Sequence, residues 1–406
     1  MNIAIVGGGP AGFAAGILAS NSNNRVVIFE KNPEVLKKLL LTGNGKCNYR
    51  NANQSLDKYH TTYPDIAAII NPTNLKLVSD FWNNLGIIPI IKNGYYYPFS
   101  EKASSMKSAL LKKSEDLGIT IKCHTEITNI EYKENKFLVQ TSNFTETFDK
   151  VIIATGSLAY PKTGSTGFGY EVAQKNNHHI VSLNPSLVQL VSNSSITSNW
   201  SGIRSNVIVK HIEDNKVCKE ESGEIQLTDY GVSGICIFNL SRNISIGLTK
   251  GKKEKISINF VPWCQSNFLE FLNNRHQELP NRNITELCDA FLNYKLLYAI
   301  CKYSHINPDK SWDKLTAIEQ KLFAQNLTDF ELIITATKDY NYSQVCSGGV
   351  SLADLNLQTL ESLKIPGLYF CGEVLDLDGD CGGYNLTIAI LSGIIAGSAA
   401  KEDIYA

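Results

Sequence analysis

A glycine-rich turn near the N-terminus constrains the fold of this chain more than any other feature. Residues 2–6 (NIAIV) form a short apolar run, Gly7–Gly12 (GGGPAG) follow, and residues 13–20 are small enough to form a closely packed helix. A second apolar run, residues 25–29, ends at Glu30. This order predicts a β-strand, an α-helix and a second β-strand in a buried parallel sheet.

The spacing of the glycines suits the pyrophosphate of a dinucleotide. In Gly-x-Gly-x-x-Gly the first glycine permits a tight turn, the second lets the backbone approach a pyrophosphate, and the third lets helix and strand pack closely. The helix N-terminus offers free N–H groups to the phosphates, and an acid at the end of the second strand can bind a ribose diol. The residues expected to contact the dinucleotide here are Gly7, Gly9, Pro10, Ala11, Gly12, Glu30 and Lys31.

Later segments favour FAD as that dinucleotide. An apolar strand over residues 150–154 ends in Ala154, Thr155 and Gly156, like the strand that passes beside the dinucleotide in two-dinucleotide-fold flavoproteins. Residues 368–373 end in Gly372 and Glu373, like the C-terminal segment of those proteins, whose acid lies near the ribityl chain. Residues 382–385 (GGYN) then open a helix whose N-terminus could face the flavin N1–C2=O edge, where negative charge develops on reduction.

Other redox machinery is missing from the sequence. A second strand–Gly-x-Gly-x-x-Gly–helix unit does not occur, and none of the ten cysteines lies in Cys-x-x-Cys or Cys-x4-Cys. A redox-active dithiol is therefore not expected. Either NADH or NADPH binds transiently over the flavin, or electrons arrive by another route.

Composition and length describe a large globular protein. A chain of 406 residues suggests two or three domains, and 38 basic against 39 acidic residues argue against a surface coated in positive charge for nucleic acid. The scattered cysteines are typical of reduced thiols in the cytoplasm. The N-terminus lacks the basic region of a signal peptide, and residues 386–400 are too short to span a membrane, so they predict a buried helix and no membrane partner.

The character of the sequence changes at Pro185. Residues 186–264, with about 333–342, alternate apolar and polar side chains and predict an inserted antiparallel β-domain. Residues 265–332 have helical spacing and predict a small helical insert. Residues 1–185 and 343–406 then predict one α/β domain that binds FAD and is built from both ends of the chain.

Motifs along almost the whole chain resemble the HI0933-like (YhiN/BaiN-type) flavoproteins. The loop at residues 43–48 (GNGKCN) looks like the family's GNGRCN, with Lys46 in place of arginine. Cys346-Ser347 stands where threonine and a small residue are usual. Further matches are residues 97–103, 154–157, 160–161, 164–167, 227–234, 348–350, 372–379 and 382–386.

The resemblance implies a Rossmann-like, glutathione-reductase-like FAD domain with an inserted antiparallel β-barrel-like domain and a helical piece. It also implies a reductase of activated C=C bonds, in which hydride passes from reduced flavin N5 to the β-carbon and an acid protonates the α-carbon. Cys47 and Tyr384 are the candidate proton donors, because both lie in glycine-rich loops expected to face the flavin. The alternatives are a packed, unreactive thiol for Cys47 and a packing or flavin-shielding role for Tyr384. The further FAD contacts implied are Gly45, Lys46, Cys47, Asn48, Ile127, Asp380, Gly382, Gly383, Tyr384, Asn385 and Leu386.

Three functions remain open at this point. The favoured one is reduction of uridine to dihydrouridine in large-subunit ribosomal RNA or its precursor. The basic loop at residues 250–255 is interpreted as a solvated hairpin, with a phosphate contact as the alternative. The alternative is reduction of a small enone of steroid or bile-acid type. The third is a non-enzymatic flavin redox sensor or assembly factor.

Several other features favour structural roles. Asp376, Asp378 and Asp380 lack the spacing of a calcium loop and are interpreted as turn formers or polar groups of the flavin site, so no metal site is expected. His178 and His179 are expected at the surface. Residues 95–97 (YYY) are interpreted as a packed strand in preference to a platform for stacked bases.

Overall fold

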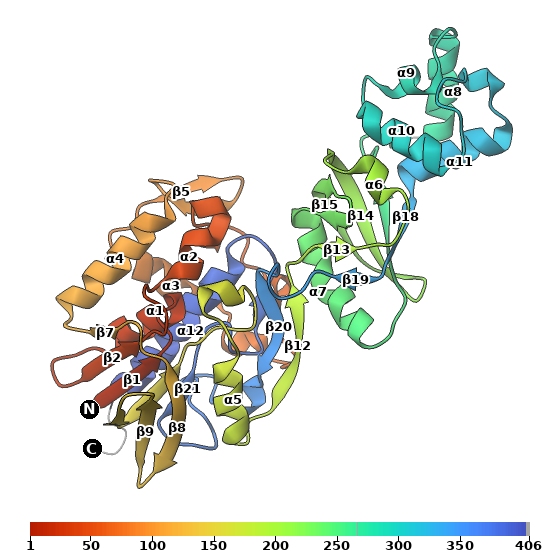
Figure 1. Cartoon of the computed structure of the whole chain (residues 1–406). Coiled ribbons are helices and arrows are strands. Elements are labelled where there is room, and N and C mark those ends of the chain that lie inside the picture. Colours follow the sequence, from red (N-terminus) through yellow and green to blue (C-terminus); the bar gives the residue numbers. More distant parts are fainter. Residues whose placement is uncertain (266, 403–406) are drawn as a thin grey trace. The chain divides into compact units, whose positions relative to one another are not determined.

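A computed structural model describes residues 1–265 and 267–402 of the chain. These residues form two compact units (Figure 1). The first unit combines Met1–Leu183 with the chain from Gln344 onward, and the second is Asn184–Ser343.

A five-stranded parallel sheet lies at the centre of the first unit. Its order is β21 (Leu368–Phe370), β11 (Lys150–Ile153), β1 (Asn2–Val6), β2 (Arg25–Phe29) and β7 (Thr120–Lys122). All four neighbouring pairs run parallel, and β21 brings the C-terminal part of the chain beside β11. The predicted parallel, Rossmann-like α/β sheet is therefore confirmed, and both ends of the chain contribute to it.

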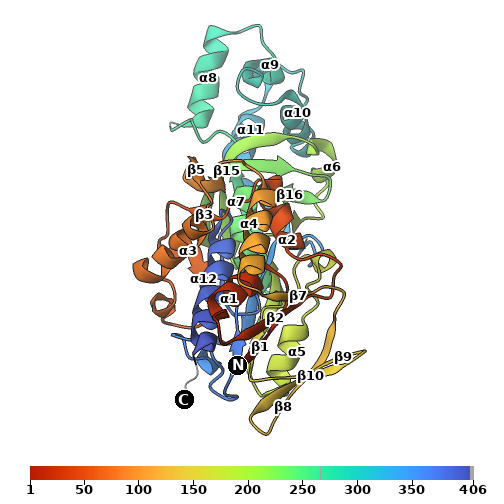
Figure 2. The same ribbon diagram turned by 90° about the vertical axis from the view of Figure 1, so that its left-hand side faces the viewer.

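Two helices from opposite ends of the chain pack against one another in this unit (Figure 1, Figure 2). They are α1 (Pro10–Ala19) and α12 (Tyr384–Lys401). A Cβ built on Gly397 would lie 2.3 Å from the carbonyl oxygen of Ala15, so only glycine allows this approach. The apolar stretch 386–400 is a buried helix as predicted. No helix among the described residues has the length and apolar character needed to cross a bilayer.

Smaller elements surround the parallel sheet. The two-residue strands β4 (Tyr59–His60) and β22 (Asp378–Gly379) pair antiparallel and join segments far apart in the sequence. The remaining helices of this unit are α2 (Lys37–Leu41), α3 (Pro72–Asn84), α4 (Ala103–Asp116) and α5 (Phe168–Lys175). The remaining strands are β3 (Arg50–Asn51), β5 (Pro89–Lys92), β6 (Tyr95–Pro98), β8 (Ile127–Lys133), β9 (Lys136–Thr141), β10 (Thr145–Phe148) and β20 (Val345–Val350). Strand β12 (Ile180–Ser186) pairs with β20 and begins in this unit and ends in the second.

The second unit contains a seven-stranded antiparallel sheet and a group of helices. In order the strands are β18 (Phe330–Ile334), β17 (Glu254–Asn259), β14 (Arg204–Glu213), β15 (Lys216–Leu227), β16 (Gly231–Ser233), β13 (Leu190–Val191) and β19 (Ala336–Thr337). The helices are α6 (Thr197–Trp200), α7 (Ile235–Thr249), α8 (Phe268–Glu278), α9 (Ile284–Cys288), α10 (Tyr294–Tyr303) and α11 (Ala317–Thr328). The sheet and these helices share one apolar core.

Helix α7 lies in a segment that the sequence analysis assigns to strands. Gly234, with φ of 114°, ends β16 and begins the helix. Cys236, Ile237, Leu240 and Ile244 are buried and recur at helical spacing. The apolar residues of Ile235–Thr249 thus recur with a helical period. This period was not recognised because the flanking strands alternate apolar and polar residues.

Candidate functional site

The glycine turn between β1 and α1 has two glycines packed against backbone and one facing open space. A Cβ on Gly7 would lie 2.3 Å from the Ala154 carbonyl oxygen, and one on Gly12 would lie 2.0 Å from the Gly7 carbonyl oxygen. A Cβ on Gly9 would meet no atom of the described residues within 4 Å. Gly9 is also the N-cap of α1 and makes no side-chain capping bond, so the helix N-terminus can receive an anion. This cradle fits a pyrophosphate.

Glu30 is held beside that turn at the end of β2. Its Oε2 accepts a hydrogen bond from the Gly8 N–H (3.0 Å), and its Oε1 accepts from the backbone and side-chain nitrogens of Asn32 (both 2.8 Å). A carboxylate has about four lone-pair sites, so capacity remains for a ribose diol. The neighbouring Lys31 donates to the Thr166 hydroxyl (3.2 Å).

Two buried side-chain oxygens at predicted contact positions have no hydrogen-bond partner among the residues that the structure describes. They are Thr155 Oγ1, directly after β11, and Asn48 Oδ1, in the loop after α2. Buried polar atoms are normally paired, so both positions fit a bound group that supplies donors. The Ala154 N–H donates to the Val6 carbonyl (2.8 Å), and Gly156 has φ of 74°. The turn at residues 154–156 therefore lies beside the C-terminal end of β1.

The C-terminal segment passes next to the start of α1. A Cβ on Gly372 would lie 2.8 Å from the Cβ of Ala11, and the Gly372 N–H donates to the Ser392 hydroxyl (2.8 Å). The following Glu373 forms an ion pair with Lys38 (2.6 Å) and accepts a hydrogen bond from Ser157 (3.1 Å). These two partners of Glu373 could not be predicted, because both lie far from it along the chain.

The loop that contains Gly45, Lys46, Cys47 and Asn48 leads to the N-terminus of α12. A Cβ on Gly383 would lie 2.7 Å from the backbone of Arg50, and the Asn51 side chain donates to the Gly382 carbonyl (3.1 Å). The Thr387 hydroxyl donates to the Tyr49 carbonyl (3.3 Å). The structure therefore brings together two predicted contact segments that lie more than 300 residues apart.

Predicted contact residues form the first turn of α12 and bind it to the preceding strand. Gly383 is the N-cap with φ of 97° and has no side-chain capping bond, so this helix N-terminus is also open to a ligand. The Asn385 side chain accepts from the Gly379 N–H (2.9 Å) and donates to the Gly379 carbonyl (2.8 Å). Leu386 is buried.

The two candidate proton donors are enclosed by protein. Cys47 has no exposed surface, and this burial raises the pKa of its thiol to about 12. Tyr384 is 3% exposed and packs edge-on against Tyr59, with ring centroids 5.4 Å apart. Burial raises the pKa of the Tyr384 phenol above its ordinary value. Both groups keep their protons firmly near neutral pH.

The remaining residues named from the sequence lie away from the glycine cradle or make contacts only within the protein. Lys46 forms an ion pair with Glu101 (3.3 Å), and Ile127 is a buried residue at the start of β8. The prediction that His178 lies at the surface is wrong: it is 4% exposed, and its ring bonds Ala173 and Ser362, whereas His179 is exposed. The predicted strand at 95–97 is confirmed as β6.

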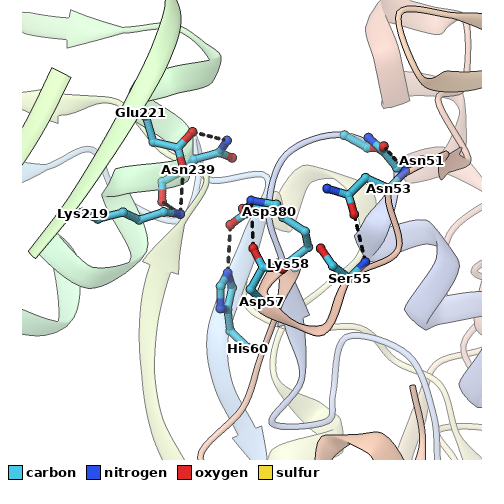
Figure 3. Close-up of polar contacts among 12 residues, drawn as sticks. Asn51, Asn53, Ser55, Asp57, Lys58, His60, Lys219, Glu221, Asn239 and Asp380 are labelled. Atoms are coloured by element: carbon cyan, nitrogen blue, oxygen red, sulfur yellow. Dashed lines mark hydrogen bonds and ion pairs between the residues drawn. The ribbon is translucent and has the colours of Figure 1, made fainter. Parts of the chain in front are cut away.

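The three aspartates that follow β21, Asp376, Asp378 and Asp380, are buried, and Asp376 and Asp380 bind different side chains. Asp376 accepts from the backbone and hydroxyl of Thr62, and its Oδ1 has no hydrogen-bond partner in the described part of the chain. Asp380 accepts from His60 (2.8 Å) and pairs with Lys58 (3.4 Å), and both side chains point toward it in Figure 3. Neither His60 nor Lys58 was predicted as a site residue, because no motif marks them.

Comparison with known proteins agrees with this geometry. Residues 1–399 match the model described as HI0933-like protein Rossmann domain. The chain is 31% identical over 404 residues to the 3-dehydro-bile acid delta(4,6)-reductase of Clostridium scindens, covering 98% of this chain and 99% of the reductase. It is 26% identical over 385 residues to the ribosomal RNA dihydrouridine synthase of Escherichia coli, covering 94% and 93% of the two chains.

Among solved structures, a flavocytochrome c3 fumarate reductase in its open conformation is 15% identical and superposes with a TM-score of 0.48. The superposition covers 98% of this chain and 78% of that one. The family model spans nearly the whole chain. The matched residues include the glycine cradle and both of the chain ends that meet beside it. The chain therefore belongs to the HI0933-like family and is an FAD-dependent oxidoreductase.

Proposed function

We propose that this protein reduces an activated C=C bond in a small enone of steroid or bile-acid type, with NADH or NADPH as the electron donor. The observation that carries the proposal is the similarity to the Clostridium scindens reductase, which extends over 98% of this chain at 31% identity. The similarity to the ribosomal RNA enzyme is lower, at 26%. From the sequence alone, a small enone was the alternative and uridine in ribosomal RNA was the favoured substrate. The higher similarity to the bile-acid reductase makes the small enone the favoured substrate.

The chain supplies binding and orientation for this reaction. Gly9 and the N-terminus of α1 would hold the FAD pyrophosphate, Glu30 would bind a ribose, and the N-terminus of α12 would stabilise negative charge on the ring system. When bound, FAD supplies the hydride. The buried surroundings of Cys47 and Tyr384 would exclude water from this end of α12.

The charges of the second unit give little support to an RNA substrate. In the basic loop at 250–255, Lys252 pairs with Glu213 (2.5 Å) and Lys255 pairs with Glu331 (2.8 Å). Lysines that are paired within the protein lose part of their attraction for phosphates. Since the whole chain carries a formal charge of −1, no excess of basic residues compensates for this pairing.

The proposal is tested by the half-reactions of the purified protein. We expect NADH or NADPH to reduce the bound FAD anaerobically, and a steroid enone to reoxidise it, whereas the corresponding saturated ketone does not. Dihydrouridine in ribosomal RNA should be the same with and without the gene. Loss of dihydrouridine on deletion of the gene, with no reoxidation by any enone, would return the assignment to uridine in ribosomal RNA.

A further inference from the structure

His60 and Asp380 form a pair at the N-terminus of α12. Asp380 lies between β22 and the glycines that begin the helix, and its N–H donates to the Lys58 carbonyl (2.9 Å). The pairing of β22 with β4 places His60 opposite Asp378. Residues 50–51, which follow the Cys47 loop, contact the same glycines. His60 therefore lies at the end of α12 where the predicted flavin contacts converge.

The side chains of this pair are arranged to hold the imidazole in one orientation. Asp380 is 4% exposed, and its Oδ1 lies 2.8 Å from His60 Nε2. Its Oδ2 lies 3.4 Å from Lys58 Nζ, which also pairs with Asp57 (3.3 Å). A carboxylate at one ring nitrogen fixes the tautomer and leaves the other nitrogen for chemistry. His60 Nδ1 bonds to no group in the described part of the chain, and the His60 side chain is 24% exposed.

His60 differs from the other acids at this end of α12. Cys47 and Tyr384 are enclosed, and the carboxylates of Asp376 and Asp380 already accept hydrogen bonds from Thr62 and His60. A general acid works best when its pKa lies near the working pH and when it reaches both substrate and solvent. Histidine is the side chain whose ordinary pKa lies in that range. Among these groups, His60 is the one imidazole, and its side chain has access to solvent.

We propose that His60, positioned by Asp380, is the proton donor of the reductase; this assignment rests on the proposed function. As hydride adds to the β-carbon, the C=C electron pair forms a new C–H bond at the α-carbon with the proton from Nδ1 of the imidazolium. The Nδ1–H bond breaks, and the ring becomes neutral while its Nε2–H stays bound to Asp380. Solvent then returns a proton to Nδ1. The two electrons gained by the substrate are those of the hydride.

The test compares His60→Gln with the matched control His179→Gln, which replaces an exposed histidine of the same unit. Each protein is loaded with FAD, reduced anaerobically with dithionite, and mixed with a steroid enone over a range of pH. We expect His60→Gln to reoxidise about 100-fold more slowly or worse, with a flattened pH profile, and His179→Gln to match the parent. Affinity for FAD and the thermal unfolding temperature should be unchanged in both.

Two further variants separate a chemical role from a structural one. Added imidazole should restore reoxidation to His60→Ala, and Asp380→Asn should shift the pH profile, because Asp380 acts through the ring. The charged groups near the ring that set this profile are Asp380, which bonds it, Lys58 and Asp57, which pair with one another, and Asp378, which lies opposite His60 in the β4–β22 pair. Parental reoxidation by His60→Gln, or loss of FAD from it together with no rescue of His60→Ala, would overturn the assignment. A parent that no enone reoxidises would instead overturn the proposed function, and the role of His60 with it.

Discussion

Gly393 in the last helix lies directly against Ala11 in the first: a Cβ at position 393 would lie 2.4 Å from the Ala11 carbonyl oxygen. Ala11 also follows the first residue of the helix whose N-terminus forms the glycine cradle. The same contact therefore joins the two ends of the chain and sets the backbone of the candidate pyrophosphate site. Packing and cofactor binding are coupled at this position.

Replacing Gly393 by valine should disrupt this contact. We expect Gly393→Val to lower the free energy of unfolding by about 1–3 kcal/mol, because the added atoms must displace backbone, and to weaken FAD binding. Ser398→Val is the matched control, since Ser398 is exposed on the same helix. Chemical denaturation with and without FAD measures both effects. Equal stability of the two variants would show that the close approach is not required.

The two later glycines of the N-terminal turn should respond differently to alanine. Gly12→Ala places a Cβ 2.0 Å from the Gly7 carbonyl oxygen, so it should lower the unfolding temperature of the protein even without FAD. Gly9→Ala meets no protein atom within 4 Å, so it should leave the apoprotein stable and weaken FAD binding. Thermal melts and FAD titrations distinguish the two. Normal FAD affinity in Gly9→Ala would place the pyrophosphate elsewhere.

The thiol of Cys47 should resist alkylation. With a pKa of about 12, only about one molecule in 10⁴ carries the thiolate at pH 8, and the thiolate fraction rises tenfold per pH unit up to that pKa. Cys218 is exposed and should react quickly with iodoacetamide in the same sample. Peptide mass spectrometry over time measures both rates. Comparable labelling of the two cysteines in the folded protein would contradict the enclosed environment of Cys47.

The paired lysines of the β-domain should contribute little to binding of nucleic acid. We expect a fragment of large-subunit ribosomal RNA to bind weakly at physiological salt, and Lys252→Ala to leave the affinity within about twofold. Glu213→Gln removes the partner of Lys252 and should tighten binding at low salt. A large loss of affinity in Lys252→Ala, with a reduced salt slope, would instead identify a phosphate contact.

The parts of the fold that depend on local sequence were predictable. In the Gly-x-Gly-x-x-Gly motif, a Cβ on Gly7 or Gly12 would strike backbone and one on Gly9 would meet open space, so the motif itself specifies the geometry. The buried strands β1, β2 and β11 follow from short apolar runs. The same approach failed for α7, where seven of the helix's residues are buried among strands and the helical period was not recognised.

The parts of the candidate site that depend on distant contacts were not predictable. His60 and Asp380 are separated by 320 residues and meet only because β4 pairs with β22, two strands of two residues each. Such short strands carry no periodicity. His178 likewise lies in a polar stretch of sequence, yet it is buried. The hydroxyl of Ser362, 184 residues away, forms a hydrogen bond with its ring. Burial of polar groups depends on partners that a single sequence does not reveal.

The central claim is that both ends of the chain build one FAD site. The most direct test is the visible absorption spectrum of the purified protein after incubation with FAD and removal of unbound flavin. We predict flavin absorption bands that correspond to one FAD per chain, with the bound flavin lost in Gly9→Ala. A parent protein that remains colourless after reconstitution would contradict the account.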